Sequence, residues 1–111
     1  MKQHAAKDLR YAVDLLDTDG ATTLVSGVGA GIVDLSGHRL EQAQLENSET
    51  THMVLLRWAD AQPLPQQGYI SVTDPGSSDV TLYVVDYLKD PREPRPRVWT
   101  EAYCHVMRIN S

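Results

Sequence analysis

The sequence predicts an all-β domain, rich in strands with one short inserted α-helix and built as a small antiparallel barrel or sandwich of about six strands. Three observations predict it. Apolar residues recur with strand spacing along the chain, turn residues separate these segments roughly every ten residues, and one stretch has helical spacing instead. With 111 residues, the chain is expected to form one domain over residues 9–111, preceded by a flexible N-terminal arm at residues 1–8.

The strands are predicted from apolar alternation bounded by Gly, Pro, Asn and Asp. The first shows it cleanly, because Tyr11, Val13 and Leu15 fall on one face of an extended chain. Residues 17–20 end it as a turn, since Asp-Gly favours positive φ. The predicted strands are residues 10–16, two pieces at 21–26 and 32–35 around a glycine stretch, 51–58, 69–73, 80–88 and 98–109.

The helix is predicted at residues 37–46, between the strand piece at 32–35 and the strand at 51–58. Ser36 is a reasonable N-cap, because its hydroxyl can accept a backbone N–H of the first turn. Leu40 and Ala43, with Leu45 as a further candidate, give a narrow apolar stripe among Glu and Gln residues. We expect this stripe to dock on the barrel.

This order of motifs resembles the bacteriophage head–tail joining proteins, also called head-closure, head-completion or neck proteins. The resemblance depends on two segments. In VDLSGHRLEQAQ, Leu-Ser-Gly begins a short Ala/Gln helix, and ETTHMVLLRW is a strand with the order Thr-His, apolar residues, Arg and an aromatic residue. Later strands also fit, and the resemblance covers about residues 9–107. Two features depart from the family: arginines are sparse in the first strand, and residues 25–31 are glycine-rich where a Trp and polar residues are usual.

The resemblance implies a structural assembly protein rather than an enzyme. It implies a homo-oligomeric ring, a dodecamer, that sits beneath the portal or adaptor protein and extends the DNA channel. The other side of the ring would offer the attachment surface for the tail terminator or another tail protein. Phage DNA would pass through without specific binding, and the location would be the virion neck, assembled in the cytoplasm of the host bacterium.

Charge and hydropathy agree with this expectation. The formal net charge is −5, whereas a dedicated nucleic-acid binder usually has a basic surplus that replaces phosphate counterions. No run of about 18 apolar residues is present, so we expect no membrane span. Cys104 is the single cysteine, which excludes an internal disulfide and predicts a small buried apolar side chain.

The candidate chemical motifs each fail on spacing. The alternating glycines at 27, 29 and 31 lack the third glycine and long helix of a dinucleotide fingerprint. Residues 17–20 lack the ligands of a calcium loop. The four histidines show no metal-ligand spacing, and Ser26 has no nucleophile-elbow context. We therefore expect no catalytic residue, no cofactor and no metal.

A partner interface is predicted at the end of the strand at residues 80–88. The proline-stiffened loop that follows can form forked hydrogen bonds to carboxylates on a partner. The predicted interface residues are Tyr87, Lys89, Arg92, Arg95 and Arg97.

Two alternative functions remain open. One is a tail-completion or tail-terminator protein, and the other is an OB-like single-stranded nucleic-acid-binding domain. The second requires aromatic residues on a basic face, for which Tyr69, Tyr83 and Tyr103 are the candidates.

Overall fold

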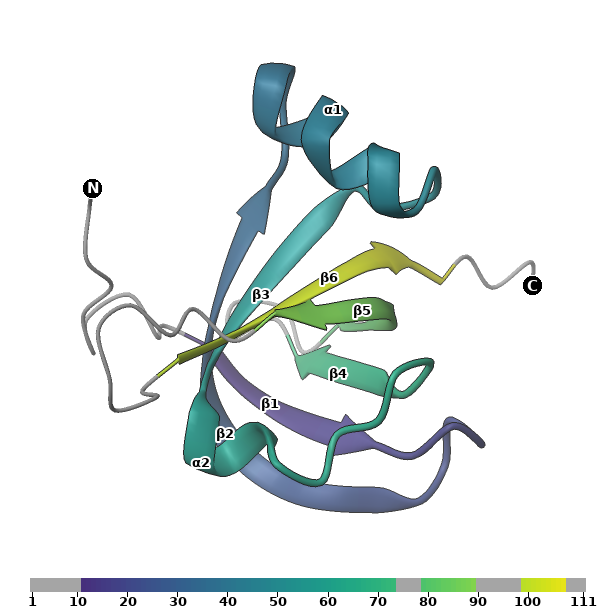
Figure 1. Cartoon of the computed structure of the whole chain (residues 1–111). Helices are drawn as coiled ribbons and strands as arrows, with labels where there is room; N and C mark the ends of the chain where they lie inside the picture. Colours follow the sequence, from purple (N-terminus) through teal and green to yellow (C-terminus); the bar gives the residue numbers. More distant parts are fainter. Residues whose placement is uncertain (1–10, 74–78, 90–98, 108–111) are drawn as a thin grey trace.

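A computed structural model describes residues 11–73, 79–89 and 99–107, and it shows a closed barrel of six antiparallel strands (Figure 1). Around the barrel the strands follow the order β1-β2-β3-β6-β5-β4. The elements are β1 (Tyr11–Leu16), β2 (Thr23–Asp34), α1 (Gly37–Glu46), β3 (His52–Arg57), α2 (Trp58–Ala61), β4 (Tyr69–Thr73), β5 (Val80–Lys89) and β6 (Trp99–Val106). The predicted fold class is confirmed.

Side chains fill the barrel interior. Val54 and Leu56 of β3 point inward, are fully buried, and belong to a cluster with members from all six strands. Ala61 of α2 and Leu64 of the next loop belong to the same cluster, so this segment closes one end of the barrel. A barrel of this size leaves no water-filled lumen.

The other face of β3 is buried beneath α1, which lies over β3 and β6 at the top of Figure 1. Met53 and Leu55 form a second apolar cluster with Ala43, and Leu40 packs against it half-buried. The predicted docking of the Leu40/Ala43 stripe is therefore confirmed. Leu45, the further candidate for the stripe, is 87% exposed and lies outside it.

The helix spans the predicted residues, and its ends are held by the backbone. Ser36 occupies the N-cap position with extended backbone, but its hydroxyl makes no capping hydrogen bond. At the other end the N–H of Asn47 donates to the carbonyl of Ala43 over 3.2 Å. Packing on β3 therefore stabilises α1 more than its caps do.

Two strand predictions need correction. The pieces around the glycine stretch form one continuous twelve-residue strand, β2, which pairs with β1 and then with β3. Gly27 has φ +68 within it, a conformation that favours glycine. Trp58 begins the short helix α2 and does not end β3, because the backbone leaves the sheet after Arg57.

Strand β5 carries an irregularity that shapes its outer face. Its pairing with β6 shifts between Val85 and Tyr87, which leaves Asp86 as the extra residue of a β-bulge. Val85 and Leu88 both pack into the barrel interior. Asp86 and Tyr87 therefore share the outer face, beneath α1 and the loop that follows it.

Several sequence predictions lie outside the described residues. They are the N-terminal arm, the turn at 74–76, the ends of the last strand, and the interface residues Arg92, Arg95 and Arg97.

Candidate functional site

The predicted interface residues Tyr87 and Lys89 lie at a small cleft between α1 and the barrel. The cleft has a volume of about 80 Å³, and it is lined by Leu35, Arg39, Gln42, Ala43, Tyr87, Lys89 and Tyr103. We call it the α1 groove. Its walls come from α1 on one side and from the outer faces of β5 and β6 on the other.

A stacked aromatic pair forms the floor of the α1 groove. The rings of Tyr87 and Tyr103 are 4.8 Å apart between centroids and only 7° from parallel. The hydroxyl of Tyr87 donates to the carbonyl of Ala43 over 3.2 Å, and that of Tyr103 donates to the Glu101 carboxylate over 3.0 Å. Tyr87 therefore joins the helix to the sheet, a structural role that the sequence did not predict.

Burial also changes the acidity of this pair. Desolvation raises the pKa of Tyr103 to about 12, and the nearby Glu101 carboxylate adds to the shift. Desolvation raises the pKa of Tyr87 as well. Both phenols are therefore neutral hydrogen-bond donors at physiological pH.

The α1 groove brings cationic side chains together beside the Glu101 carboxylate. The described residues include eleven of the fifteen Asp and Glu residues but only three Lys and Arg residues: Arg39, Arg57 and Lys89. Two of these three line the groove. The ammonium of Lys89 lies 5.7 Å from both ring centroids, beside the stacked pair.

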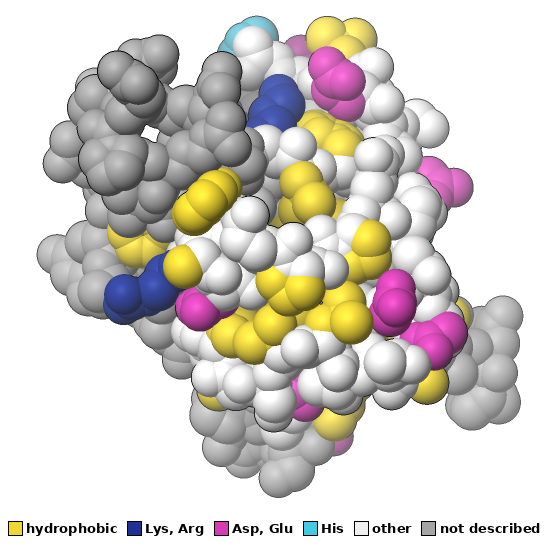
Figure 2. Space-filling model, turned by 60° about the horizontal axis from the view of Figure 1, so that its bottom comes forward, with side chains coloured by type: hydrophobic (Ala, Val, Ile, Leu, Met, Phe, Trp, Pro, Cys, Tyr) yellow, Lys and Arg dark blue, Asp and Glu magenta, His cyan; other side chains and the backbone are white. Residues whose placement is uncertain are grey.

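The rest of the described surface has a different character. On the face shown in Figure 2, acidic side chains are scattered around the surface and Lys or Arg side chains are sparse, with hydrophobic side chains gathered near the middle. At the β1–β2 turn, hydrogen bonds from Thr22 and Ala21 lower the pKa of Asp19 to about 2. This carboxylate stabilises the turn, and Gly20 there has φ +70, in agreement with the turn predicted at residues 17–20.

A larger hollow of about 440 Å³ lies at the barrel end opposite α2. It is lined by Tyr11, Ile32, Asp34, Val72, Thr81 and Tyr83. His52 lies beside it, with Nε2 2.8 Å from the Asp34 carboxylate and its ring edge-on to Tyr83. The Thr51 hydroxyl contacts the other ring nitrogen, Nδ1, over 2.7 Å. Sequence reasoning missed this chain of polar groups, because the register of β2 on β3 sets Asp34 opposite His52 and the sheet brings Tyr83 to them from β5.

The structure thus brings together two of the five predicted interface residues, Tyr87 and Lys89, and adds Arg39, Gln42 and Tyr103 to them. Sequence spacing carried no signal for Arg39 or Gln42, since α1 and β5 lie about forty residues apart in the chain. Cys104 is fully buried, as predicted, and burial raises the pKa of its thiol.

Comparison with known proteins adds no further assignment. No protein-family model matches the chain, and no curated protein matches it. Neither helix in the described part of the chain is long and apolar enough to cross a membrane.

Proposed function

We propose that this protein is a subunit of a phage neck, a head-closure or head–tail joining protein that forms a ring beneath the portal. One observation supports the proposal above all. The described residues form a closed barrel whose only long helix within them, α1, enters between β2 and β3 and docks on the outer face. This is the place at which the sequence resemblance puts the helix of that family.

The mechanism proposed is assembly. A ring is a heterologous arrangement, in which one surface of each subunit meets a different surface of its neighbour. Each contact can then be weak, because the contacts are summed around a closed ring and by simultaneous binding to the portal. An isolated subunit is expected to remain monomeric until the portal templates the ring, and analytical ultracentrifugation that finds stable rings without portal would contradict this expectation.

The filled barrel limits where DNA can run. Since the interior is occupied by side chains, the channel must form between subunits and not within one barrel. The acidic excess of the described residues favours a channel wall that repels the phosphate backbone and does not retain it. A dodecameric ring of such subunits would let DNA pass without specific binding.

The α1 groove is the proposed contact with the portal, the tail protein or a neighbouring subunit. Its aromatic floor and two cationic side chains suit an acidic segment of a partner, since Arg39 and Lys89 can bind carboxylates against the aromatic surface. The predicted loop residues Arg92, Arg95 and Arg97 follow Lys89 in the chain and would extend this positive surface.

The single-stranded nucleic-acid alternative gains no support from the aromatic residues. Tyr83 is buried in the barrel, and Tyr103 is stacked on Tyr87. Tyr69 lies against the β1–β2 turn, where its ring is 3.3 Å from the position that a Cβ atom would take if Gly20 had a side chain. These three tyrosines form no exposed row for stacked bases. Tail completion remains the second candidate within the assembly class.

In vitro complementation tests the proposed contact. DNA-filled heads and free tails from a host in which the gene is inactivated would be mixed with purified protein, and tailed particles counted by electron microscopy. We expect wild type and the control Arg57→Glu to restore joining, and Lys89→Glu to restore at most a tenth as many particles. Arg57→Glu makes the same charge change at an exposed residue outside the groove. Equal joining by both variants would remove the groove from the proposal.

A further inference from the structure

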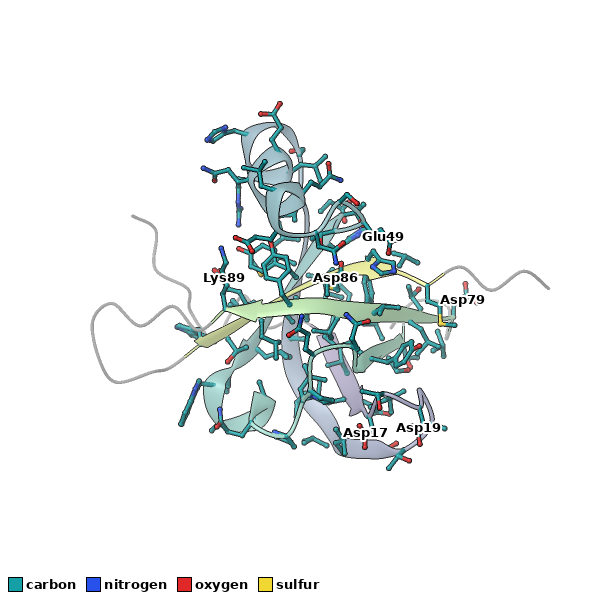
Figure 3. The ribbon with its side chains drawn as sticks, turned by 45° about the vertical axis from the view of Figure 1, so that its right-hand side comes forward. Asp17, Asp19, Glu49, Asp79, Asp86 and Lys89 are labelled. Carbon is teal, nitrogen blue, oxygen red and sulfur yellow. The ribbon has the colours of Figure 1, made fainter. Side chains whose placement is uncertain are left out.

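A second polar cluster lies on the outer face of the barrel, separate from the α1 groove. It consists of Glu49, Asp86 and His105, and one ligand atom of each lies within 4.8 Å of the others. Figure 3 shows Glu49 and Asp86 close together and apart from Lys89. Three elements supply the residues: the loop after α1, the bulge of β5, and β6. None of these positions is close to another in the sequence.

The two nitrogens of the His105 ring face different carboxylates. Nδ1 lies 2.9 and 3.1 Å from the two oxygens of Asp86, a hydrogen-bonding distance. Nε2 lies 3.6 Å from the carboxylate of Glu49, which is too long for a hydrogen bond. Two atoms that bind one tetrahedral zinc ion at about 2.0–2.2 Å lie roughly 3.3 to 3.6 Å apart. The spacing of Nε2 and Glu49 therefore matches a pair of ligands on one ion.

Asp86 is built to hold the imidazole in this orientation. Its side chain is 2% exposed, and the buried Thr50 hydroxyl donates to it over 2.7 Å. The bulge in β5 turns it towards His105, and the Gln66 side-chain amide donates to its backbone carbonyl over 3.0 Å. Histidines that bind metals usually donate their other ring N–H to such a carboxylate, which fixes the tautomer and the ring orientation.

Charge balance also favours a cation between Nε2 and Glu49. When Nδ1–H donates to Asp86, the lone pair of a neutral Nε2 faces the negative Glu49 carboxylate. Among the described residues, no Lys or Arg forms an ion pair with this cluster. The two negative charges of Glu49 and Asp86 are therefore balanced by at most one positive charge, that of a protonated His105. A divalent cation bound to a neutral imidazole brings the net charge of the cluster to zero, which lowers the cost of burying Asp86.

We infer that the chain carries a zinc site in which His105 Nε2 and the Glu49 carboxylate bind the ion and Asp86 is the positioning residue behind the imidazole. Glu49 is 70% exposed, so its side chain is free to adjust and water can fill the remaining positions. Mixed imidazole and carboxylate ligands suit Zn²⁺, whereas Mg²⁺ prefers oxygen ligands in a regular octahedron. The bound ion would tie the loop after α1 to β6.

The test is calorimetric titration of chelator-treated full-length protein with zinc chloride, and with magnesium chloride in parallel. We expect one zinc per chain and no magnesium binding at the same concentrations. Glu49→Gln and His105→Ala should each weaken zinc binding by at least about tenfold, and Asp86→Asn by about 10- to 100-fold. The matched controls are His38→Ala and Glu41→Gln, which alter exposed residues of α1 and should leave binding unchanged.

Imidazole NMR of the same samples separates the two ring nitrogens. Zinc should shift the Nε2 resonance of His105 and leave Nδ1 protonated. Zinc binding that is equal in wild type and in Glu49→Gln, whose exposed position should not affect folding, would overturn the inference. So would a zinc-induced shift at Nδ1, or an equal loss of binding in the His38→Ala control.

Discussion

Removing the Thr50 hydroxyl tests the buried polar network that joins the α1 loop to the barrel. Thr50 is fully buried, Asp86 is 3% exposed, and their hydrogen bond is 2.7 Å long. A hydrogen bond to a charged group contributes about 1.5–3 kcal/mol, and the near-isosteric change Thr50→Val removes it without leaving a cavity. In chelator-containing buffer we therefore expect Thr50→Val to lower the free energy of unfolding by about 1.5–3 kcal/mol. For a chain of this length the melting temperature should fall by roughly 5 to 15 °C.

The assay is urea unfolding followed by circular dichroism, with Thr50→Ser as the matched control. Serine keeps the hydroxyl and loses one methyl group, so it should cost only about 0.8 kcal/mol. A double-mutant cycle with Asp86→Asn isolates the pair, and residues in direct contact typically couple by about 0.5–3 kcal/mol. A coupling energy near zero, or equal losses of stability in the valine and serine variants, would show that this hydrogen bond does not anchor the loop.

Three further changes test the core, the helix contact and the aromatic pair. Leu56→Ala should lower the free energy of unfolding by about 2–5 kcal/mol in urea titration, because Leu56 is fully buried in the barrel and leaves a cavity. Tyr87→Phe should lower the free energy of unfolding by about 0.5–1.5 kcal/mol in the same assay, since it removes the hydrogen bond to the Ala43 carbonyl but keeps the stacked ring. Burial raises the pKa of the Tyr103 phenol from 10.0 to about 12. The neutral phenol therefore stabilises the fold fully below pH 10, and this stabilisation is lost as the pH rises from 10 towards 12, because the phenol ionises first in the unfolded chain. Melting temperatures across this range should fall less steeply in Tyr103→Phe, and absorbance at 295 nm should show one late-ionising phenol fewer in this variant than in wild type.

Local patterns in the sequence were sufficient to predict most of the fold. Residues 37–46 have helical spacing between two strand segments, and the barrel's strands follow from alternation and turn residues. The face assignment within β3 was also correct, with Val54 on one side and Met53 on the other. These features depend on neighbours in the chain, so local chemistry determines them.

Long-range geometry accounts for what the sequence did not predict. Trp58 fits the apolar strand pattern, yet it begins α2, because tertiary packing takes the backbone out of the sheet there. The bulge at Asp86 has no signature in the residues around it, and without it Asp86 and Tyr87 would point to opposite faces. Both the α1 groove and the polar cluster of Glu49, Asp86 and His105 depend on that bulge.

The central proposal is that copies of this chain form the ring between head and tail. The most direct measurement is a cryo-EM reconstruction of the neck of the particle produced by the strain that encodes the chain, with mass spectrometry of the same particles. We expect peptides of this chain in the particle, and a ring of density beneath the portal into which the six-stranded barrel with α1 fits. If purified tailed particles contain no peptide of this chain, or if other chains fill the neck density completely, the protein is not the ring between head and tail.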